Sequence, residues 1–509
     1  MNYIISHDVG TQSSKAVLIG TDGKVYDSFE QEYGIDLPRP GWVEQNPEDY
    51  WDAICNTTRQ IVKKLKDKKS VLAMVFSTQA MGIIPVDENG RLLYPNISWV
   101  DARAGSQSVK IMNRFLGKPV FKKITGVELS GKDVIPKLLW IKEQLPEVYQ
   151  NTCKFLDVNG FLKYRCTGNM VAEWSGACSY GFDLNKKDWE RTFFKISGID
   201  VDKLPDLVRS TDLVGTLTQK AARELGLPES VKIFGGCDDT QSAAMGSGQT
   251  GHHEAHIYLG SSAWVGISTQ KNYKFKNGVA SLQSADPESS FLVGITESAG
   301  VNIEWALKKL YKEEQADGKD VYRIMEKEVS ETPAGADHLL FTPWFQGERA
   351  PVTSTTTRST LFNLSLEHNR GHIMTAMLEG IGYNLKWTVN NIKRDYGISI
   401  GQLTVIGGGS QNAAWMQSLS NILNVDINIT KNPKLGGAIG SAMIALVGLG
   451  IEKDFSKIKE MNPVVRTFKP AKDHQEVYQE MFENYRSLYY SLKKTYHRIN
   501  FKRYNRESV

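Results

Sequence analysis

The chain has 509 residues, of which 41% are hydrophobic and 23% are charged, with 44 glycines and five cysteines. This composition predicts a globular protein with more than one domain, and it excludes disordered, collagen-like, coiled-coil and disulfide-rich proteins. The net charge of +4 is too small to indicate nucleic-acid binding without a localised basic stripe.

Three short strands are predicted within the first thirty residues. Apolar residues 3–5 are followed by a polar turn over residues 10–14 and then by apolar residues 16–19. Asp22 and Gly23 predict a hairpin into the third strand. This antiparallel start differs from a dinucleotide-binding domain, in which the glycine-rich turn opens a helix.

Three helices are predicted from capping signals and apolar spacing. The first covers residues 48–66, because Asn46 and Pro47 are suited to its N-cap and first positions. Residues 436–450 are apolar but shorter than a membrane span, so they predict a buried helix. Residues 474–496 carry apolar side chains at helical spacing and predict a terminal helix.

The strand–turn–strand pattern of the N-terminus recurs over residues 255–268. Two such units predict a duplicated architecture, with one α/β domain in each half of the chain. Residues 246–251 are rich in glycine and suit a hinge. We therefore place the boundary there, between domains over residues 1–248 and 249–509.

The first turn contains the residue types that bind phosphate. Small residues let backbone N–H groups approach an anion, hydroxyls donate hydrogen bonds, and a carboxylate can hold a metal through water. Residues 8–15 contain all three. An ordinary glycine-turn hairpin explains this segment equally well when it is taken alone, and the Gly-Ser-Ser turn at residues 260–262 is a weaker signal.

A glycine triplet ends a predicted strand late in the chain. Gly407, Gly408 and Gly409 would let a purine or a phosphate approach the backbone, and Ser410 can cap the following helix. Close packing of a helix on a strand is the better explanation if these glycines are taken alone.

Two adjacent carboxylates, Asp238 and Asp239, follow a glycine-rich strand end and precede small residues typical of a tightly packed helix. A side chain in this position can reach a substrate and take a proton from an alcohol. Either aspartate could instead be a plain helix N-cap.

Taken together and in this order, these elements resemble the FGGY carbohydrate kinases, members of the superfamily that contains actin. The resemblance runs from Asp8 to about Ala445. It includes segments similar to the family's Trp-x-Glu-Gln, Trp-x-Asp-x-Arg and Gly-Glu-Arg-x-Pro motifs, which begin here at Trp42, Trp99 and Gly347. The resemblance implies an α/β fold of two ribonuclease-H-like, actin-like ATPase domains that flank a catalytic cleft, with the sugar and the base mainly in the first and ATP mainly in the second.

The resemblance also implies roles for individual residues. Asp239 is selected over Asp238 as the base, because the family's aspartate precedes a glycine by seven positions, as Asp239 precedes Gly246. Asp8 would bind Mg²⁺, largely through water. The residues expected to hold ATP are Thr11, Gln12, Ser13, Gly260, Ser261, Ser262, Gly408, Gly409 and Asn412. The residues expected to contact the sugar are Gln79, Met81, Trp99, Asp101, Arg103 and Asp239.

The function expected from this resemblance is ATP-dependent phosphorylation of a ketose or polyol. A catalytically silent sugar- or nucleotide-binding regulator is the alternative, and Asp239 argues against it. A dinucleotide oxidoreductase is disfavoured, because no G-x-G-x-x-G segment opens a helix near the N-terminus.

One departure from related kinases and one similarity to them bear on the choice of substrate. After Gln79, glycerol kinases carry Arg-Glu and xylulokinases Met-His, whereas this chain has Ala80 and Met81, so glycerol is disfavoured. The segment from Trp99 to Arg103 looks closer to the xylulokinase version, which favours a pentulose such as D-xylulose. Met81 weakens that choice, because a thioether offers no strong hydrogen bond to a sugar hydroxyl.

The remaining sequence signals concern location and partners. The cysteine count is odd and no C-x-x-C spacing occurs, which favours reduced thiols in a cytoplasmic protein. The N-terminus shows neither a basic segment nor a signal-length apolar run. We expect sugar and ATP as ligands and neither nucleic acid nor a membrane as a partner, and a homodimer stays open.

Overall fold

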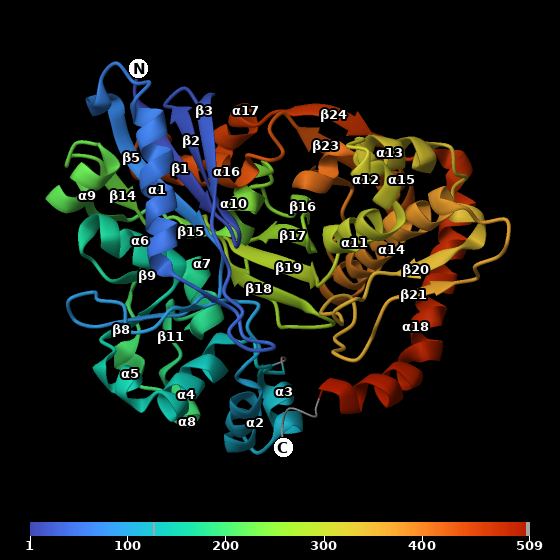
Figure 1. Cartoon of the computed structure of the whole chain (residues 1–509), viewed down its shortest axis with the longest axis horizontal. Coiled ribbons are helices and arrows are strands. Elements are labelled where there is room, and N and C mark those ends of the chain that lie inside the picture. The colour runs from blue at the N-terminus through green and yellow to red at the C-terminus, as the bar shows by residue number, and fades with distance from the viewer. Residues whose placement is uncertain (126–127, 505–509) are drawn as a thin grey trace.

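The computed structural model describes residues 1–125 and 128–504 and shows two α/β halves side by side (Figure 1). The first half is built on a mixed sheet with the strand order β13-β14-β5-β1-β2-β3, and β15 also pairs with β5. Its strands are β1 (Tyr3–Val9), β2 (Ser13–Gly20), β3 (Val25–Glu32), β5 (Val71–Thr78), β13 (Leu213–Thr216), β14 (Lys232–Phe234) and β15 (Cys237–Asp238).

The second half repeats this connectivity. Its sheet has the order β18-β19-β17-β16-β22-β23-β24. In each sheet a first strand pairs antiparallel with the second and parallel with a later strand, so β16 corresponds to β1, β17 to β2 and β22 to β5. The strands are β16 (Ala255–Leu259), β17 (Ala263–Thr269), β18 (Val279–Gln283), β19 (Ser290–Thr296), β22 (Gln402–Ile406), β23 (Asp426–Thr430) and β24 (Val464–Phe468). The predicted duplication and the two-domain fold are thereby confirmed.

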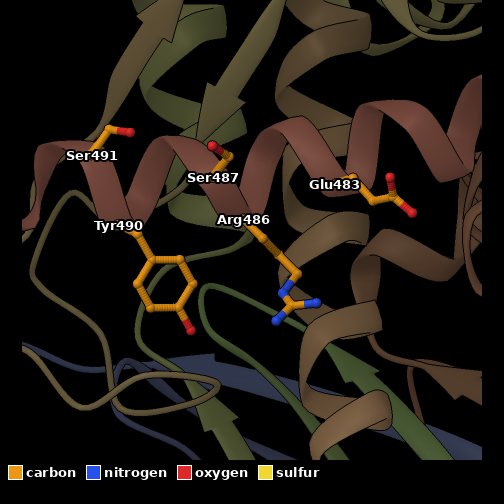
Figure 2. Close-up of a pocket in the computed structure, with 5 residues that line it drawn as sticks. All are labelled: Glu483, Arg486, Ser487, Tyr490 and Ser491. Carbon is orange, nitrogen blue, oxygen red and sulfur yellow. The ribbon is translucent and has the colours of Figure 1, made fainter.

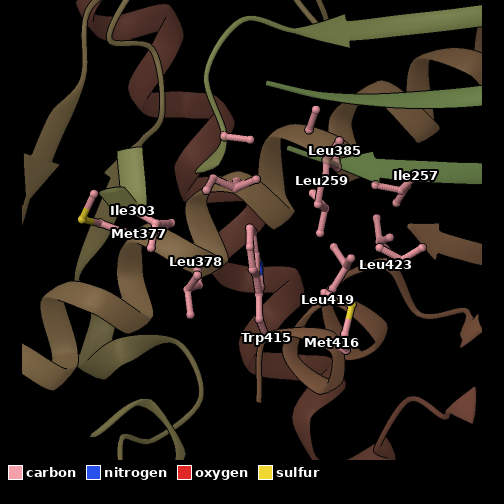
Figure 3. Packing of buried hydrophobic residues seen from close by; sticks show 14 of the residues in the cluster. Ile257, Leu259, Ile303, Met377, Leu378, Leu385, Trp415, Met416, Leu419 and Leu423 are labelled. Carbon is pink, nitrogen blue, oxygen red and sulfur yellow. The ribbon is translucent and has the colours of Figure 1, made fainter. Parts of the chain in front are cut away.

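Helices cover the outer face of each sheet. Asn46 caps α1 (Pro47–Val62) through a bond from Glu48 N, as the sequence predicts, although the helix ends four residues earlier than expected. The first sheet's outer face packs on α1, α6 (Val158–Thr167) and α9 (Gln219–Leu225). The second sheet's outer face packs on α11 (Gly300–Leu310), α13 (Val321–Ser330), α14 (Arg370–Tyr396) and α15 (Ala413–Leu423). Figure 3 shows this second core, in which Ile257 and Leu259 of β16 lie close to Trp415 and Leu419 of α15.

Further strands and helices complete each half. Short paired strands in the first half are β4 (Glu44–Gln45) with β7 (Asn96–Ile97), β6 (Ile84–Val86) with β8 (Lys154–Leu156), β9 (Val171–Glu173) with β12 (Asp206–Val208), and β10 (Phe182–Asp183) with β11 (Asp188–Trp189). Its further helices are α2 (Gly105–Arg114), α3 (Lys118–Thr125), α4 (Val134–Gln144), α5 (Pro146–Asn151), α7 (Trp174–Ala177) and α8 (Arg191–Ser197). The second half adds β20 (Leu340–Thr342) with β21 (Thr360–Phe362), α12 (Lys312–Ala316), α17 (Ile458–Met461) and α18 (Gln475–Tyr504), the last longer than predicted.

Two helices between the sheets are exchanged between the halves (Figure 1). α16 (Gly436–Gly448), which the sequence correctly predicts to be buried, comes from the second half and packs on the first sheet beside Ile4, Val17 and Val75. α10 (Asp239–Gly246) comes from the first half, and its Ala243 and Ala244 pack on the second sheet. Each sheet is therefore completed by a helix from the other half of the sequence.

Glycines allow α10 and α16 to cross with their backbones in contact. A Cβ on Gly246 would lie 1.8 Å from the carbonyl oxygen of Gly436. A Cβ on Gly440 would lie 2.2 Å from the carbonyl oxygen of Ser242. Both positions require glycine, because the obstacle in each case is backbone that no side-chain rearrangement can move.

The described helices include none with the length and apolar character needed to cross a membrane. All five cysteines are free thiols.

Candidate active site

Asp8 lies near the end of β1, where three elements meet. The Ser77 hydroxyl, opposite Asp8 on parallel strand β5, donates to Asp8 Oδ1 at 3.1 Å. The Ser77 and Ser242 hydroxyls are 2.6 Å apart, which links the strand to α10. A Cβ on Gly437 would lie 2.9 Å from Asp8 Oδ2, so the first turn of α16 closes over this carboxylate. Burial raises the pKa of Asp8.

The two adjacent aspartates have different tasks. Asp238 is the N-cap of α10, because its Oδ1 accepts a hydrogen bond from Gln241 N at 2.8 Å. Asp239 is the first helical residue, and its carboxylate accepts a hydrogen bond from the Thr240 hydroxyl at 3.3 Å. Burial, followed by the charges of Asp238 and Asp8, raises the pKa of Asp239 to about 8. The plain capping role falls to Asp238, which leaves the Asp239 carboxylate available for chemistry.

A buried network holds the start of α10 in place. The backbone N–H of Asp238 donates to the Ser175 hydroxyl at 3.1 Å, and that hydroxyl donates to Glu173. Glu173 also accepts Ser175 N at 2.9 Å and so caps α7. Lys163 is fully buried beneath this network, and its Nζ donates to the carbonyl oxygen of Gly235 at 3.2 Å. Sequence reasoning missed this network, because Ser175 and Asp238 are 63 positions apart.

Hydrogen bonds from several segments of the first half hold the turn between β1 and β2 in place. Gly10 N donates to Ser13 O at 2.9 Å. The Tyr33 hydroxyl donates to the carbonyl oxygens of both residues. Gln45 Nε2 donates to Thr11 O at 2.8 Å, and Trp99 Nε1 donates to the Thr11 hydroxyl at 3.0 Å. The structure thus brings the expected sugar residue Trp99 against the expected phosphate residue Thr11.

Two other residues of this turn differ in whether their side chains are available to a ligand. Gln12 is exposed, whereas the Ser13 hydroxyl already donates a hydrogen bond to Glu30 at 2.7 Å. In the corresponding turn of the second half, Gly260 N donates to Ser262 O at 3.0 Å. Ser261 is exposed and Ser262 half-buried, so their hydroxyls remain available to a ligand.

In the glycine triplet at the end of β22, two glycines are needed for close packing and one has open space beside its backbone. Gly407 has φ +94°, and a Cβ there would lie 2.5 Å from Leu259 O, so it is required for packing on β16. A Cβ on Gly408 would meet no heavy atom within 4 Å, whereas one on Gly409 would meet the Trp415 ring at 2.7 Å. Gly408 is therefore the member of the triplet whose backbone is open to a ligand.

The helix after the triplet corrects one expectation. Ser410 does not cap it, because its hydroxyl turns back to Gly407 O at 2.7 Å. The cap of α15 is Asn412, whose Oδ1 accepts Trp415 N at 2.8 Å. The amide oxygen of Asn412 is thus occupied by the helix, which leaves its amide nitrogen for the expected contact with ATP.

A polar network lies on the expected sugar side. Gln79 Nε2 donates to Gln45 Oε1 at 3.2 Å and to the Tyr50 hydroxyl at 3.3 Å, and Asn96 Nδ2 donates to the same hydroxyl at 2.9 Å. Gln79 Oε1 and Asn96 Oδ1 are buried and lack a hydrogen-bond partner among the described residues. Such orphaned acceptors fit ligand hydroxyl groups. Of these four residues, sequence analysis assigned only Gln79 to the sugar site; Gln45 belongs to the Trp-x-Glu-Gln motif but was given no role.

Asp101 and Arg103 form a buried ion pair with each other. Arg103 Nη2 is 2.7 Å from Asp101 Oδ2 and Nη1 is 2.8 Å from Glu44 Oε1, and neither side chain of the Asp101–Arg103 pair has exposed surface. Val43 N donates to the same Asp101 oxygen at 2.6 Å, and the guanidinium lies 3.9 Å from the centre of the Trp42 ring. The pair ties the Trp99 segment to the Trp42 segment, and its direct contact with a sugar stays a prediction.

Met81 follows this network in a left-handed backbone conformation, with φ +62°. Its side chain is half-buried and packs against the apolar cluster of the first half. Residues without a short polar side chain rarely adopt this conformation, and strained positions gather at functional sites. Sequence reasoning named Met81 but had no signal for its backbone.

A shallow pocket elsewhere contains none of these residues (Figure 2). It lies along α18 and is lined by Glu483, Arg486, Ser487, Tyr490 and Ser491. A single helix supplies all of its lining, and we place no chemistry there.

Two family models match the chain. The model of the N-terminal domain of the FGGY family of carbohydrate kinases matches residues 3–246, and that of the C-terminal domain matches residues 255–449. A xylulose kinase of Bacillus subtilis is 28% identical over 495 residues, which cover 96% of this chain and 97% of that protein.

Solved structures share the fold. The ligand-bound xylulose kinase from Lactobacillus acidophilus has a TM-score of 0.88 and 24% identity, and the match covers 98% of this chain and 100% of that one. A gluconate kinase from the same species has a TM-score of 0.89 and 24% identity, with 98% and 99% covered.

Proposed function

The chain belongs to the FGGY family of carbohydrate kinases and is an enzyme that phosphorylates a sugar with ATP, and from this premise we propose that its substrate is a pentulose such as D-xylulose. The observation that carries the proposed site is the hydrogen-bonded link between Asp8 and α10, the helix that begins at Asp239. Asp8 accepts from Ser77, and the Ser77 hydroxyl contacts that of Ser242 on α10. Asp238 and not Asp239 caps this helix, so the Asp239 carboxylate remains available to a substrate.

Asp239 acts as the general base in this proposal. It accepts the proton of the sugar hydroxyl as that oxygen attacks the γ-phosphorus of ATP, and the bond from phosphorus to the leaving oxygen of ADP breaks. Phosphoryl transfer needs little covalent help, so positioning and charge neutralisation carry most of the catalysis. The Ser175 network serves this step by fixing the backbone from which Asp239 projects.

Asp8 is the residue proposed to hold Mg²⁺, largely through water. The fit is good, because a buried carboxylate with Oδ2 unbonded within the described structure is poorly solvated and gains from a nearby cation. Bound Mg²⁺ supplies neutralisation of phosphate charge. The proposed ATP contacts are the turn residues Thr11, Gln12, Ser13, Gly260, Ser261 and Ser262, together with Gly408, Gly409 and Asn412.

The sugar is proposed to bind between Gln79, Met81, Trp99 and Asp239, with Asp101 and Arg103 holding Trp99 in place. The relatives include kinases named for a neutral ketose and for gluconate, which carries a carboxylate. Arg103 is already committed to Asp101 and Glu44, so it is not free to bind a carboxylate. This favours the neutral ketose.

A panel of sugars tests the substrate. ADP release with ATP and Mg²⁺ is measured for D-xylulose, D-gluconate and glycerol, with Asp239→Asn as the control for contaminating kinases. We expect the highest kcat/KM with D-xylulose and little turnover of glycerol. Efficient glycerol phosphorylation would contradict this view of the sugar site. The silent-regulator alternative gains no support from the relatives, and turnover of any sugar removes it.

The remaining expectations are also proposals. We place the division between sugar-binding and ATP-binding domains at residues 1–248 and 249–509. Free cysteines support a reducing, cytoplasmic location. We expect no nucleic-acid partner, and light scattering will decide between a monomer and a homodimer.

A further inference from the structure

Tyr258 occupies in the second half the position that Asp8 occupies in the first. β16 and β1 correspond in pairing, and each runs into a turn that begins with glycine. Asp8 and Tyr258 each lie two positions before that glycine, at Gly10 and Gly260. Side chains alternate along a strand, so both residues face the region between the sheets, with Asp8 on the same side as Ile4.

The contacts of Tyr258 aim its hydroxyl at the second turn. Its ring stacks on Trp264, its register partner on β17, with ring centres 4.1 Å apart and planes at 11°. A Cβ on Gly260 would lie 2.8 Å from the Tyr258 hydroxyl oxygen and 2.5 Å from a ring carbon. The phenol therefore covers the turn that is proposed to hold phosphate. No residue of the described structure forms a hydrogen bond with this hydroxyl.

Tyr258 also lies close to the helix that carries the base. It packs against the cluster that Ala243 and Ala244 of α10 form with the second sheet. Ala243 is four positions after Asp239 and lies on the same face of α10. Burial, followed by the charges of Asp8 and Asp239, raises the pKa of Tyr258. The phenol therefore stays protonated, and its hydroxyl can donate a hydrogen bond beside the helix that carries Asp239.

We propose that Tyr258 is a catalytic residue whose hydroxyl donates a hydrogen bond to the phosphoryl group during its transfer from ATP to the sugar. This inference rests on the proposed function. The bond from phosphorus to the ADP oxygen breaks, the bond from the sugar oxygen to phosphorus forms, and the sugar proton passes to Asp239. Tyr258 keeps its own proton throughout.

The physical advantage is a fixed donor where negative charge is spread over the phosphoryl oxygens. Stacking on Trp264 holds the ring before the reaction begins, so little rearrangement is needed at the transition state. The donor comes from the second half and the base from the first. The proposal therefore explains why both must come together around one phosphoryl group.

Tyr258→Phe tests the hydroxyl alone, because phenylalanine keeps the stack on Trp264. The first measurement is calorimetry with Mg²⁺, ADP and aluminium fluoride, an analogue of the transferring phosphoryl group that needs no knowledge of the sugar. We expect the variant to bind ADP with aluminium fluoride at least tenfold more weakly, which is the scale of one lost donor, and to bind ADP alone unchanged.

A matched control is Tyr273→Phe, which removes a hydroxyl without a hydrogen bond in the described structure from a half-buried tyrosine of the same half. We expect it to match the wild type in both titrations. Equal binding of ADP with aluminium fluoride by Tyr258→Phe and wild type would overturn the proposal, as would an equal loss for ADP alone. Failure of every sugar in the panel would instead count against the proposed substrate, since calorimetry does not depend on it.

On the best substrate of the panel, the same variant provides a kinetic test. We expect kcat to fall about tenfold or more while KM for the sugar stays within about twofold, because the hydroxyl contacts phosphate and not sugar. A kcat within twofold of the wild type would overturn the proposal. A rise in sugar KM with an unchanged kcat would do the same.

Discussion

The two sheets share one connectivity but carry different residues at the ends of corresponding strands. The first ends β1 and β5 in polar side chains, with Asp8, Ser77 and Gln79 bonded into networks. The second ends β22 in glycines, and Gly408 leaves its backbone open. At these strand ends the first half therefore presents polar side chains, and β22 of the second half presents open backbone. The two sheets share a connectivity, but the residues at equivalent positions give each strand end a different chemistry.

The largest effect is expected where the first half supplies a proton acceptor. Asp239→Asn should lower kcat about a hundredfold or more and leave ADP binding intact, because an amide cannot act as the base. Steady-state kinetics and calorimetry measure both. Asp238→Asn is the matched control, since asparagine still caps a helix. A normal kcat for Asp239→Asn, together with no measurable activity for Asp238→Asn, would assign the base to Asp238.

The same residue gives a pH dependence. The pKa of Asp239 is about 8 in the folded protein and 3.8 when exposed, so only the unfolded chain releases this proton between those values. The ionisation of Asp239 therefore lowers the free energy of unfolding of the wild type as the pH rises from about 4 to about 8. Asp239→Asn should raise Tm over the wild type at pH 8 and much less at pH 4. A gain independent of pH would contradict a raised pKa.

The next effect concerns the helices exchanged between the halves. Gly246→Ala places a methyl group against the Gly436 carbonyl oxygen and should destabilise the protein by about 1–3 kcal/mol, the usual range for overpacking. It should also lower kcat, because α10 carries Asp239, the proposed base. Urea unfolding and kinetics measure the two effects. Gly401→Ala, where a Cβ would meet nothing within 4 Å, should change neither.

A smaller effect is expected from the network behind the base. Ser175→Ala removes the acceptor of the Asp238 N–H and should lower kcat several-fold, while KM for ATP changes little. Ser420→Ala is the control, because its hydroxyl is also buried and bonded but lies in the second half. Both variants should lose similar stability in urea. An equal loss of kcat in both would make the role of Ser175 purely structural.

The backbone site of the second half predicts a change in binding without a change in folding. Gly408→Ala adds a methyl group that meets no protein atom, so Tm should stay unchanged. If ATP approaches this backbone, KM for ATP should rise several-fold. An unchanged KM would move the nucleotide away from Gly408.

The smallest effect concerns the choice of sugar by the first half. Met81→His adds a hydrogen-bonding group where this chain has a thioether, and it should raise kcat/KM for D-xylulose by a few-fold. Assays with D-xylulose and D-gluconate measure the change. A variant no better than the wild type would remove residue 81 from the sugar contacts but leave the sugar class intact.

The sequence predicts those features of the fold that depend on residues close together along the chain. The turns after β1 and β16 follow from local glycines and hydroxyls, and the cap of α1 follows from Asn46 and Pro47. Ser77 and Thr78 are polar residues at the end of the apolar strand β5, and this change from apolar to polar is a local signal from which Ser77 can be predicted. The bond from Asp238 to Ser175 and the commitment of Arg103 to Glu44 join residues far apart along the chain, so local pattern could not reveal them.

The exchange of α10 and α16 also bears on how the chain is made. A ribosome that has synthesised residues 1–248 has produced every strand of the first sheet, but not the helix that covers Ile4, Val17 and Val75. That apolar face has no intramolecular cover until residue 448 has emerged. We therefore expect the nascent N-terminal half to depend on chaperones during synthesis, and a truncated product ending near residue 248 to be prone to aggregate.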